Sequence, residues 1–531
     1  MTDSSLERLG TAVAFLAAEV SEGRVPTRAA LEKLKKRAAK EFSLDRYVSN
    51  SEIITALPAS NQDLFEQMLT VHPRRSASGI VVVTAFTAPF SCPHGTCVFC
   101  PGGPRFGTPQ SYLPHSPGMK TALSFGFDPC LQVQSSLAKY KANGHETSKV
   151  ETIIEGGTFI ADPSEYQLTF VKGVYDGLNG VPSTSLEAAQ ETNESAANRC
   201  VGLTLESKPD WCRPLDVDLM LLYGITRLEI GVQSLRDETL ALSNRGHSVR
   251  DAVDAFRVAR DAGLKITAHM MPGLPGATPQ HDLEDLRALF DREDLRPDMT
   301  KLYPTLVVPG TALARQFEAG LYSPYDLETV VELLSEMKRF VPPWHRIMRI
   351  QREIPSDEIS GGVKNGNLRE LVLARAREKG FRCGCIRCRE VALGSPQSLD
   401  AEDELRYSEL RFKASEGIEV FGSFEYVKRG RIAGFVRLRL PSDRAHRPEA
   451  HGAAFVRELR VYGRAVAVGG KDPGAWQHKG LGGALLEAAE KTVREDFGAR
   501  RVVVTSAVGT RNYYRRLGYA REGPYMSKVL E

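Results

Sequence analysis

The chain has 531 residues, of which 42% are hydrophobic and 25% charged, and its formal net charge is +3. This length is too great for one hydrophobic core and predicts two to four domains, and any basic binding surface must be local. The sequence contains no apolar run of about 18 residues, so we expect no membrane span. The first residues lack a signal-peptide pattern. Nine cysteines, six of them in two tight clusters, are typical of metal sites in a reducing compartment, so we expect a cytoplasmic protein.

Residues 1–75 are predicted to be helical, because apolar residues from Leu6 to Leu16 recur at near-helical spacing. The segment 33–40 carries five basic residues in eight. Most such runs form a solvated helix face, and the alternative is contact with phosphate groups.

Three cysteines, Cys92, Cys97 and Cys100, follow an apolar, strand-like run at 80–86. Three thiolates are one short of the four that close an ordinary zinc or iron–sulfur site. A cubane cluster held by three cysteines leaves one iron open, which can hold S-adenosylmethionine and cleave it reductively to a radical. A structural zinc knuckle and a set of core cysteines are the alternatives, and the spacing favours iron–sulfur.

Residues 76–365 alternate short apolar runs with helical patterns. This alternation predicts βα units and a parallel sheet, as a partial or full barrel. Such folds place their chemistry at the carboxyl ends of the strands. The polar stretch 181–199 is interpreted as a surface insertion. The predicted strands are 80–86, 150–157, 201–207, 226–232 and 264–271.

Residues 366–400 are predicted to form a linker that contains Cys383, Cys385 and Cys388. The C-x-C-x2-C spacing indicates a metal site, with zinc as the expected structural ion and free thiols as the alternative. The fourth ligand is not evident from the sequence; His345 is a candidate, and the alternative is that it is an exposed side chain.

Basic residues are dense in this linker: seven lysines and arginines lie between positions 369 and 389, against two glutamates. They predict a local anion-binding surface on a nearly neutral protein. The alternative is that they pair with acidic groups inside the protein.

Residues 401–531 change to strands at 418–427, 431–440 and 454–462, followed by a helix at 480–497 and a strand at 501–507. This order predicts a separate α+β domain.

The motif Gln-x-x-Gly-x-Gly at 477–482 precedes the long helix of this domain. Glycines at a helix N-terminus let a pyrophosphate approach unpaired N–H groups, and the arrangement resembles the acyl-CoA loop of the GNAT acetyltransferases. A turn capped by glycines is the alternative. The string 509–519 resembles the last GNAT motif, in which a tyrosine protonates a leaving thiolate or positions the acyl group. Tyr513 and Tyr514 point about 100° apart in a helix, so we expect one of them to face the site.

Several strings occur in the order in which they occur in one known family. From about residue 50 to the end, the chain resembles the catalytic subunit of Elongator and its stand-alone bacterial and archaeal homologues. The resemblance implies a partial (βα) barrel of the radical-SAM type, then a GNAT-like α+β domain, with a helical N-terminal region that binds tRNA. The strings are 156-GGTFI-160, 209-PDWC-212, 226-TRLEIGVQS-234, 244-NRGH-247, 269-HMMPGLPG-276, 301-KLYPTLVVPGT-311 and 508-VGTRNYYRRLGY-519.

The resemblance also implies an activity, the modification of the wobble uridine of tRNA by a carboxymethyl-type group at C5. A [4Fe–4S] cluster on Cys92, Cys97 and Cys100 would cleave S-adenosylmethionine. The radical would abstract hydrogen from the methyl group of acetyl-CoA, the carbon radical would add to uridine C5, and water would release the thioester. An electron donor for the cluster is implied as well, and the oligomeric state is left open between a monomer and a homo-oligomer.

The resemblance assigns site residues by position, including a catalytic set and two cofactor sites. Lys208 stands where the family often has arginine, and a lysine meets a carboxylate without the bidentate geometry of arginine. The catalytic set is Tyr514, Tyr513, His478 and Lys149. The site for S-adenosylmethionine is Gly156, Gly157, Thr158 and Lys208, and that for acetyl-CoA is Lys149, Glu458, Leu459, Arg460, Val461, Gln477, Gly480, Leu481, Gly482, Gly483 and Tyr514.

Two other functions compete with this interpretation. The chain could be a protein lysine acetyltransferase whose radical-SAM half is a scaffold, or a tRNA-binding subunit that has lost catalysis. The presence of Cys92, Cys97 and Cys100 argues against both.

Overall fold

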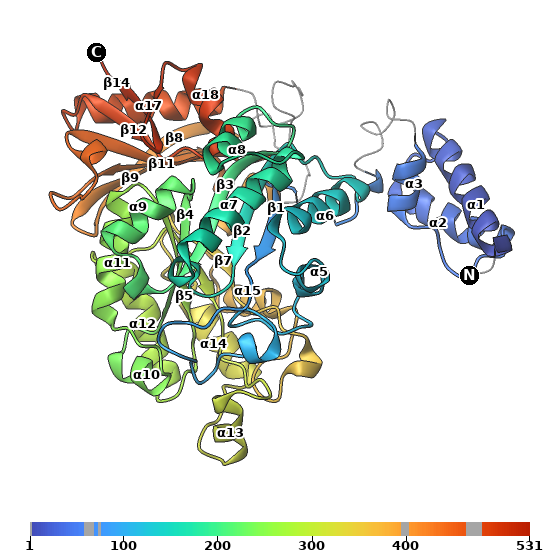
Figure 1. The fold of residues 1–531 in the computed structure, drawn as a ribbon, viewed down its shortest axis with the longest axis horizontal. Helices are drawn as coiled ribbons and strands as arrows, with labels where there is room; N and C mark the ends of the chain where they lie inside the picture. The colour runs from blue at the N-terminus through green and yellow to red at the C-terminus, as the bar shows by residue number, and fades with distance from the viewer. Residues whose placement is uncertain (1–2, 58–67, 73–75, 394–402, 464–479) are drawn as a thin grey trace.

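The computed structural model describes residues 3–57, 68–72, 76–393, 403–463 and 480–531. Its N-terminal part is helical and stands to one side of the molecule (Figure 1). A capping box between Ser49 and Glu52 begins the third helix of this part, and Leu16, Leu31 and Ile53 are fully buried between the helices. No helix of the described residues is long and apolar enough to cross a membrane. The helices are α1 (Asp3–Ser21), α2 (Arg28–Glu41) and α3 (Asn50–Ala56).

The central part is a seven-stranded parallel sheet in which the strands are paired in chain order. The first and last strands are not paired with each other among the described residues, so the sheet is a partial barrel with a lateral opening. The strands are β1 (Val81–Phe86), β2 (Lys149–Glu155), β3 (Arg199–Ser207), β4 (Arg227–Gln233), β5 (Lys265–Met270), β6 (Met299–Leu302) and β7 (Arg346–Arg349).

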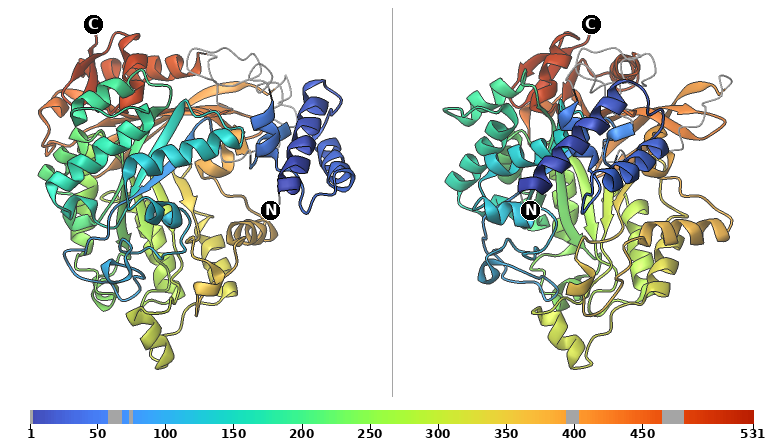
Figure 2. Two further views of the ribbon diagram at one scale, coloured as in Figure 1. Left: turned by 45° about the vertical axis from the view of Figure 1, so that its right-hand side comes forward. Right: turned by 90° about the vertical axis from the view of Figure 1, so that its right-hand side faces the viewer.

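Helices cover the outer face of this sheet (Figures 1 and 2). Helix α11 begins at a capping box of Ser248 and Asp251 and buries Ala252, Phe256 and Ala259. The larger helices are α6 (Pro129–Ala142), α7 (Ser164–Asn179), α8 (Leu186–Asn193), α9 (Pro214–Leu222), α11 (Val249–Asp261), α12 (Pro279–Asp291), α14 (Leu327–Met337) and α15 (Leu368–Glu378).

The C-terminal part is a second seven-stranded sheet, in the order β13-β14-β12-β11-β10-β9-β8. It lies at the end of the barrel where the barrel strands begin: Gly509 packs against Arg199 and Cys200, at the start of β3, and this sheet is at the top of Figures 1 and 2. Its elements are β8 (Leu405–Ala414), β9 (Gly417–Tyr426), β10 (Arg431–Leu440), β11 (Ala453–Val461), α17 (Leu481–Glu495), β12 (Arg501–Val504), α18 (Arg511–Arg515), β13 (Ala520–Glu522) and β14 (Tyr525–Val529).

The two sheets are joined by buried arginines rather than by apolar side chains alone. Arg457 in β11 binds Asp298 through two nitrogens at 2.6 and 2.8 Å. Arg439 in β10 donates to Asp261, with its Nε at 3.0 Å. All four residues are 2% exposed or less, so this charged joint fixes the C-terminal sheet on the barrel.

Candidate functional site

The cysteine loop lies after β1, at the carboxyl end of the barrel strands. Cys97 and Cys100 are buried, and Cys92 is half-buried. The sulfurs of Cys383, Cys385 and Cys388 in the linker all lie within 4.8 Å of one another, whereas the three sulfurs of this loop do not. Burial, and after it the neighbouring Cys97, raises the pKa of the Cys100 thiol to about 12.

The end of β2 closes against this loop. A Cβ atom on Gly156 would lie 1.9 Å from Thr87 Oγ1, so only glycine fits. Gly157 has a φ of +86°, and its Cβ would lie 3.5 Å from Cys92 Sγ. Thr158 Oγ1 is 3.8 Å from the same sulfur. The structure therefore brings together the cysteines and the predicted Gly-Gly-Thr motif.

Lys208 and two polar residues that the sequence analysis did not single out complete this end of the barrel. Arg245 donates to Cys97 Sγ at 3.2 Å and to Gly231 O at 2.7 Å. Gln233, at the end of β4, has a φ of +72°, which is rare for a residue with a side chain. Lys208 is 3% exposed and pairs with Asp210 at 3.2 Å. Arg245 and Gln233 lie in the strings 244–247 and 226–234, so the motifs contained a signal for both.

One cavity of about 2080 Å³ joins these features. It is lined by Cys92, Cys97 and Cys100 at one end and by Arg460 of β11 at another, and it runs along the inside of the barrel. Its wall also includes Cys383 and Cys388 of the linker. The cysteine loop, the barrel interior and the linker therefore face one shared space.

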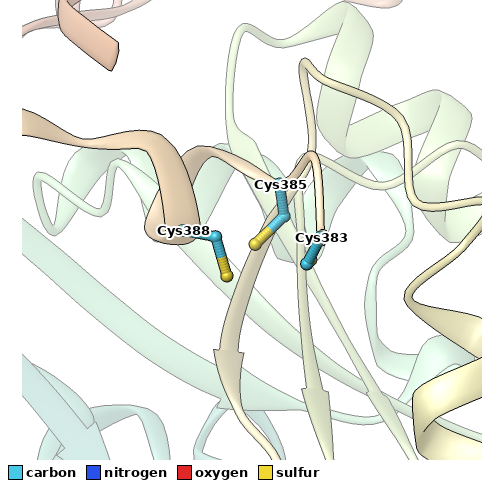
Figure 3. Close-up of side chains that lie close together, drawn as sticks. All are labelled: Cys383, Cys385 and Cys388. Atoms are coloured by element: carbon cyan, nitrogen blue, oxygen red, sulfur yellow. The ribbon is translucent and has the colours of Figure 1, made fainter. Parts of the chain in front are cut away.

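The linker cysteines lie close together (Figure 3). The sulfurs of Cys383, Cys385 and Cys388 all lie within 4.8 Å of one another, which is the arrangement of a tetrahedral metal site with three protein ligands. His345 is fully buried, not exposed. Its Nδ1 bonds to Pro297 O at 2.8 Å, and its Nε2 has no hydrogen-bond partner among the described residues. Burial lowers the pKa of His345 to about 4.

The basic residues of the linker divide into two sets. Arg375 and Lys379 bind glutamates of α14, such as Glu332, and so belong to a helix–helix contact. Arg369 and Arg387 line the cavity. Burial, and after it the like charge of Arg387, lowers the pKa of Arg369 to about 10. Within the described residues neither of these two arginines forms an ion pair with a carboxylate, so both offer positive charge to the cavity.

The C-terminal sheet opens beside β11. Strands β11 and β12 are parallel and pair only from Ala453 to Val456 on β11, while β11 continues to Val461. Helix α17 begins after Gly480, which has a φ of +82°. A Cβ on Gly482 would lie 3.0 Å from Tyr513 Oη and 3.9 Å from Val461 Cγ2. The structure thus brings the predicted strand, glycine loop and tyrosine helix together.

The two tyrosines of α18 differ in position. Tyr513 is half-buried with its hydroxyl at the first turn of α17, whereas Tyr514 is 6% exposed and packs on Tyr519. Burial raises the pKa of both hydroxyls. Lys149 begins β2 at the end nearest this sheet, opposite the cysteine loop, and burial lowers its pKa. Gln477 and His478 lie outside the described residues.

The stretch 181–199 is not the surface insertion that its polar sequence indicated. It contains α8, in which Ala189 and Asn193 are fully buried. Glu194, just after α8, binds Arg511 at 3.3 Å as well as Arg515, and its carbonyl accepts from Asn512 at 3.0 Å. The barrel part of the chain therefore holds α18, the helix that carries both tyrosines, a contact for which the sequence contained no signal.

A radical S-adenosylmethionine barrel joined to an acetyltransferase sheet is the class of protein that this architecture defines. Four family models agree in chain order. The ELP3 N-terminal domain matches residues 10–77, the Radical SAM superfamily 90–289, the Radical SAM C-terminal domain 297–378 and the GNAT acetyltransferase family 386–519. These domains imply an iron–sulfur cluster, S-adenosylmethionine and acetyl-CoA.

Relatives match over nearly the full length. The tRNA uridine(34) acetyltransferase of Methanocaldococcus jannaschii is 40% identical over 97% of this chain and 96% of its own. Elongator complex protein 3 of Homo sapiens is 40% identical over 94% of this chain and 93% of its own. The solved structure of the archaeal Methanocaldococcus infernus Elp3 with an N-terminal deletion covers 85% of this chain and all of its own, at 40% identity and a TM-score of 0.75. The chain belongs to the Elongator complex protein 3 family.

Proposed function

We propose that this protein modifies uridine 34 of tRNA at C5, using S-adenosylmethionine and acetyl-CoA. The observation that carries the proposal is the single cavity that reaches from Cys92, Cys97 and Cys100 to Arg460 on the acetyltransferase strand. Neither uridine C5 nor an acetyl methyl group reacts readily by polar chemistry at neutral pH. A radical reaction between the uridine and the acetyl group requires that both reach one shared space.

The residues of the cysteine loop fit an iron–sulfur cluster, since three thiols open into the cavity and Arg245 donates to Cys97 Sγ at 3.2 Å. When bound, a [4Fe–4S] cluster supplies the electron that cleaves S-adenosylmethionine. The protein's own contribution is orientation. Gly156 and Gly157 let backbone approach the site, while Thr158 and Lys208 offer polar groups for the amino and carboxylate ends of the cofactor.

Acetyl-CoA is assigned to the opening beside β11. The strand segment Glu458–Val461 would bind the pantetheine arm, and the first turn of α17, at Leu481–Gly483, would bind the pyrophosphate through N–H groups. Tyr513 lies nearer this turn than Tyr514 does, so we assign it the contact with the thioester, and Tyr514 supports it. Lys149, at the near end of β2, and His478 are further candidates for this site.

The tRNA is assigned to the basic wall of the cavity and to the N-terminal helices. Arg369, Arg382 and Arg387 line the cavity, and α2 contains the basic run 33–40. Within that run, Lys35 is buried and bonds to Asn50 at 2.9 Å, and Arg37 pairs with Glu41 at 3.8 Å. The exposed Lys33, Lys36 and Lys40 are left for phosphate contact.

Zinc is proposed for Cys383, Cys385 and Cys388, whose sulfurs already converge. We expect about one zinc per chain from elemental analysis. A Cys385→Ala variant is expected to lose that zinc and to have a lower melting temperature. A matched Cys130→Ala variant, which removes a half-buried cysteine outside both clusters, should retain the metal. Zinc retained in full by Cys385→Ala would contradict the assignment.

The experiment that tests the main proposal is anaerobic reconstitution with iron, sulfide and a reductant, then incubation with S-adenosylmethionine, acetyl-CoA and tRNA. We expect 5′-deoxyadenosine, tRNA-dependent release of CoA and a carboxymethyl-type mass increase on uridine 34. In the same assay, Tyr513→Phe should reduce CoA release more than Tyr514→Phe does, while both retain 5′-deoxyadenosine formation.

Two outcomes would favour the competing functions. Equal acetyl-CoA turnover without RNA, together with acetylation of a lysine peptide, would indicate a protein acetyltransferase. Tight tRNA binding with neither 5′-deoxyadenosine nor CoA would indicate a non-catalytic tRNA-binding subunit.

A further inference from the structure

The inside of the partial barrel is charged where a closed barrel would be packed with apolar side chains. The register places Glu229 of β4, His269 of β5 and Lys301 of β6 on the inner face, and all three line the cavity. They are 0%, 8% and 4% exposed. Buried charge of this kind is costly, so its presence inside a cavity points to a ligand.

The contacts of Glu229 leave one of its carboxylate oxygens unused. Lys301 Nζ and His269 Nε2 both donate to Glu229 Oε2, the histidine at 3.0 Å. Glu229 Oε1 is buried and has no hydrogen-bond partner among the described residues, and Arg227 Nη2 is 3.7 Å away. An ammonium has three protons, and the one hydrogen bond from Lys301 in the described part of the chain uses one of them. A free acceptor and a donor with spare protons therefore lie side by side.

This adjacent donor and acceptor match the Watson–Crick edge of uracil. Uracil presents O4, an acceptor, beside N3–H, a donor. Cytosine presents an amino group beside an unprotonated N3, so it would place donor against donor and acceptor against acceptor. Enzymes that act on a base take it out of the stack and read this edge in a pocket.

We propose that Lys301 and Glu229 read O4 and N3–H of the target uracil, and that His269 holds Glu229 in position. This inference rests on the proposed function, since it requires a tRNA base in the barrel. It adds the residues that select uridine over cytidine. Sites built to hydrogen-bond a substrate group reject analogues that lack it by several powers of ten.

A bound cation is the other chemistry that this cluster allows, because ligand atoms of Glu206, Glu229 and His269 lie within 4.8 Å of one another. Lys301 argues against it. Its ammonium already contacts Glu229 and would repel a divalent ion at the same carboxylate. The protein therefore supplies its own cation.

The test uses the reconstituted full chain and two tRNA transcripts that differ only in U34 or C34. The variants are Glu229→Gln, Lys301→Met and the double variant, which removes both charges and leaves no unpaired partner. Glu353→Gln is the matched control, because Glu353 lines the same cavity with an exposed side chain. The readouts are modification of each transcript, tRNA affinity, tRNA-independent 5′-deoxyadenosine formation and melting temperature.

We expect the wild type to modify U34 and to reject C34. Glu229→Gln and Lys301→Met should each modify U34 about 100-fold more slowly, with tRNA affinity and 5′-deoxyadenosine unchanged. Glu229→Gln should also lower the ratio of the U34 modification rate to the C34 modification rate, because its amide can donate to cytosine N3. Glu353→Gln should match the wild type.

Three results would overturn the inference while leaving the proposed function intact. In the first, the wild type modifies U34, and the single and double variants modify it at the same rate and discriminate equally between U34 and C34. In the second, every variant loses activity only in proportion to the fall in its melting temperature. The third is a wild type whose modification of U34 requires an added divalent ion, together with loss of this ion-dependent activity in Glu229→Gln. A wild type that does not modify U34 at all would instead contradict the proposed function.

Discussion

Replacing Cys97 by alanine is expected to abolish the cleavage of S-adenosylmethionine. Cys97 is 5% exposed, and its sulfur accepts from Arg245 at 3.2 Å. Loss of a group that only supports a ligand typically costs about 10- to 100-fold in metal affinity. Loss of one of three thiolates should therefore lower 5′-deoxyadenosine formation by more than about 100-fold. The iron content and the visible absorbance of the reconstituted protein should fall with it.

Cys200→Ala is the matched control for this variant. Cys200 is a fully buried cysteine at the start of β3, away from both clusters. It should lose some stability through the cavity left behind, yet it should retain iron and 5′-deoxyadenosine. A Cys97→Ala protein that modifies tRNA at the normal rate would disprove the radical mechanism.

Replacing Asp298 by alanine is expected to destabilise the joint between the two sheets. Asp298 accepts two hydrogen bonds from Arg457 and one from Ile266 N at 2.8 Å. Removing one partner of a buried ion pair leaves the other charge uncompensated and costs about 3 to 5 kcal/mol of unfolding free energy. The exposed pair Arg250–Asp254 is the control, and Asp254→Asn should cost about 0.5 kcal/mol or less.

The effect should depend on pH in a defined direction. Burial alone would raise the pKa of Asp298, but Arg457 and Arg437 outweigh burial and hold the pKa well below its usual range. A carboxyl with a depressed folded-state pKa stabilises the protein above its unfolded pKa, about 3.9, and loses that contribution as the pH falls through its folded value. Urea unfolding should therefore show the full difference between wild type and Asp298→Ala at pH 7 and a smaller one below pH about 4. An equal difference at both pH values would contradict this account.

Much of the architecture could be predicted from the sequence, for identifiable reasons. Strands β1 to β5 are buried on both faces or nearly so, and their apolar runs resemble those of other parallel sheets. Strands β6 and β7 were missed, because Lys301, Arg346 and Arg349 interrupt runs of only four residues. These charged side chains line the cavity. Their burial depends on the tertiary structure, so the local sequence pattern does not indicate a strand there.

The candidate site divides in the same way. Residues in short motifs, such as Gly156, Gly157 and Gly482, could be found because their chemistry needs a fixed local spacing. Glu229 and Glu194 could not, since their roles depend on partners far along the chain: Glu229 meets Lys301 72 residues later, and Glu194 meets Arg511 317 residues later. The assignments of individual site residues stay predictions until the variants above are measured.

The charged joint has a consequence for how the chain is made. Asp298 and Asp261 are synthesised 159 and 178 residues before their partners Arg457 and Arg439. At about 5 to 20 residues per second, the barrel leaves the ribosome on the order of ten seconds before those arginines exist. During that interval the nascent barrel presents unpaired carboxylates on the face that the second sheet will cover, which keeps that face hydrated and disfavours premature apolar association. The same dependence means that the C-terminal half, expressed alone, would expose its arginines, so acetyltransferase assays should use the whole chain.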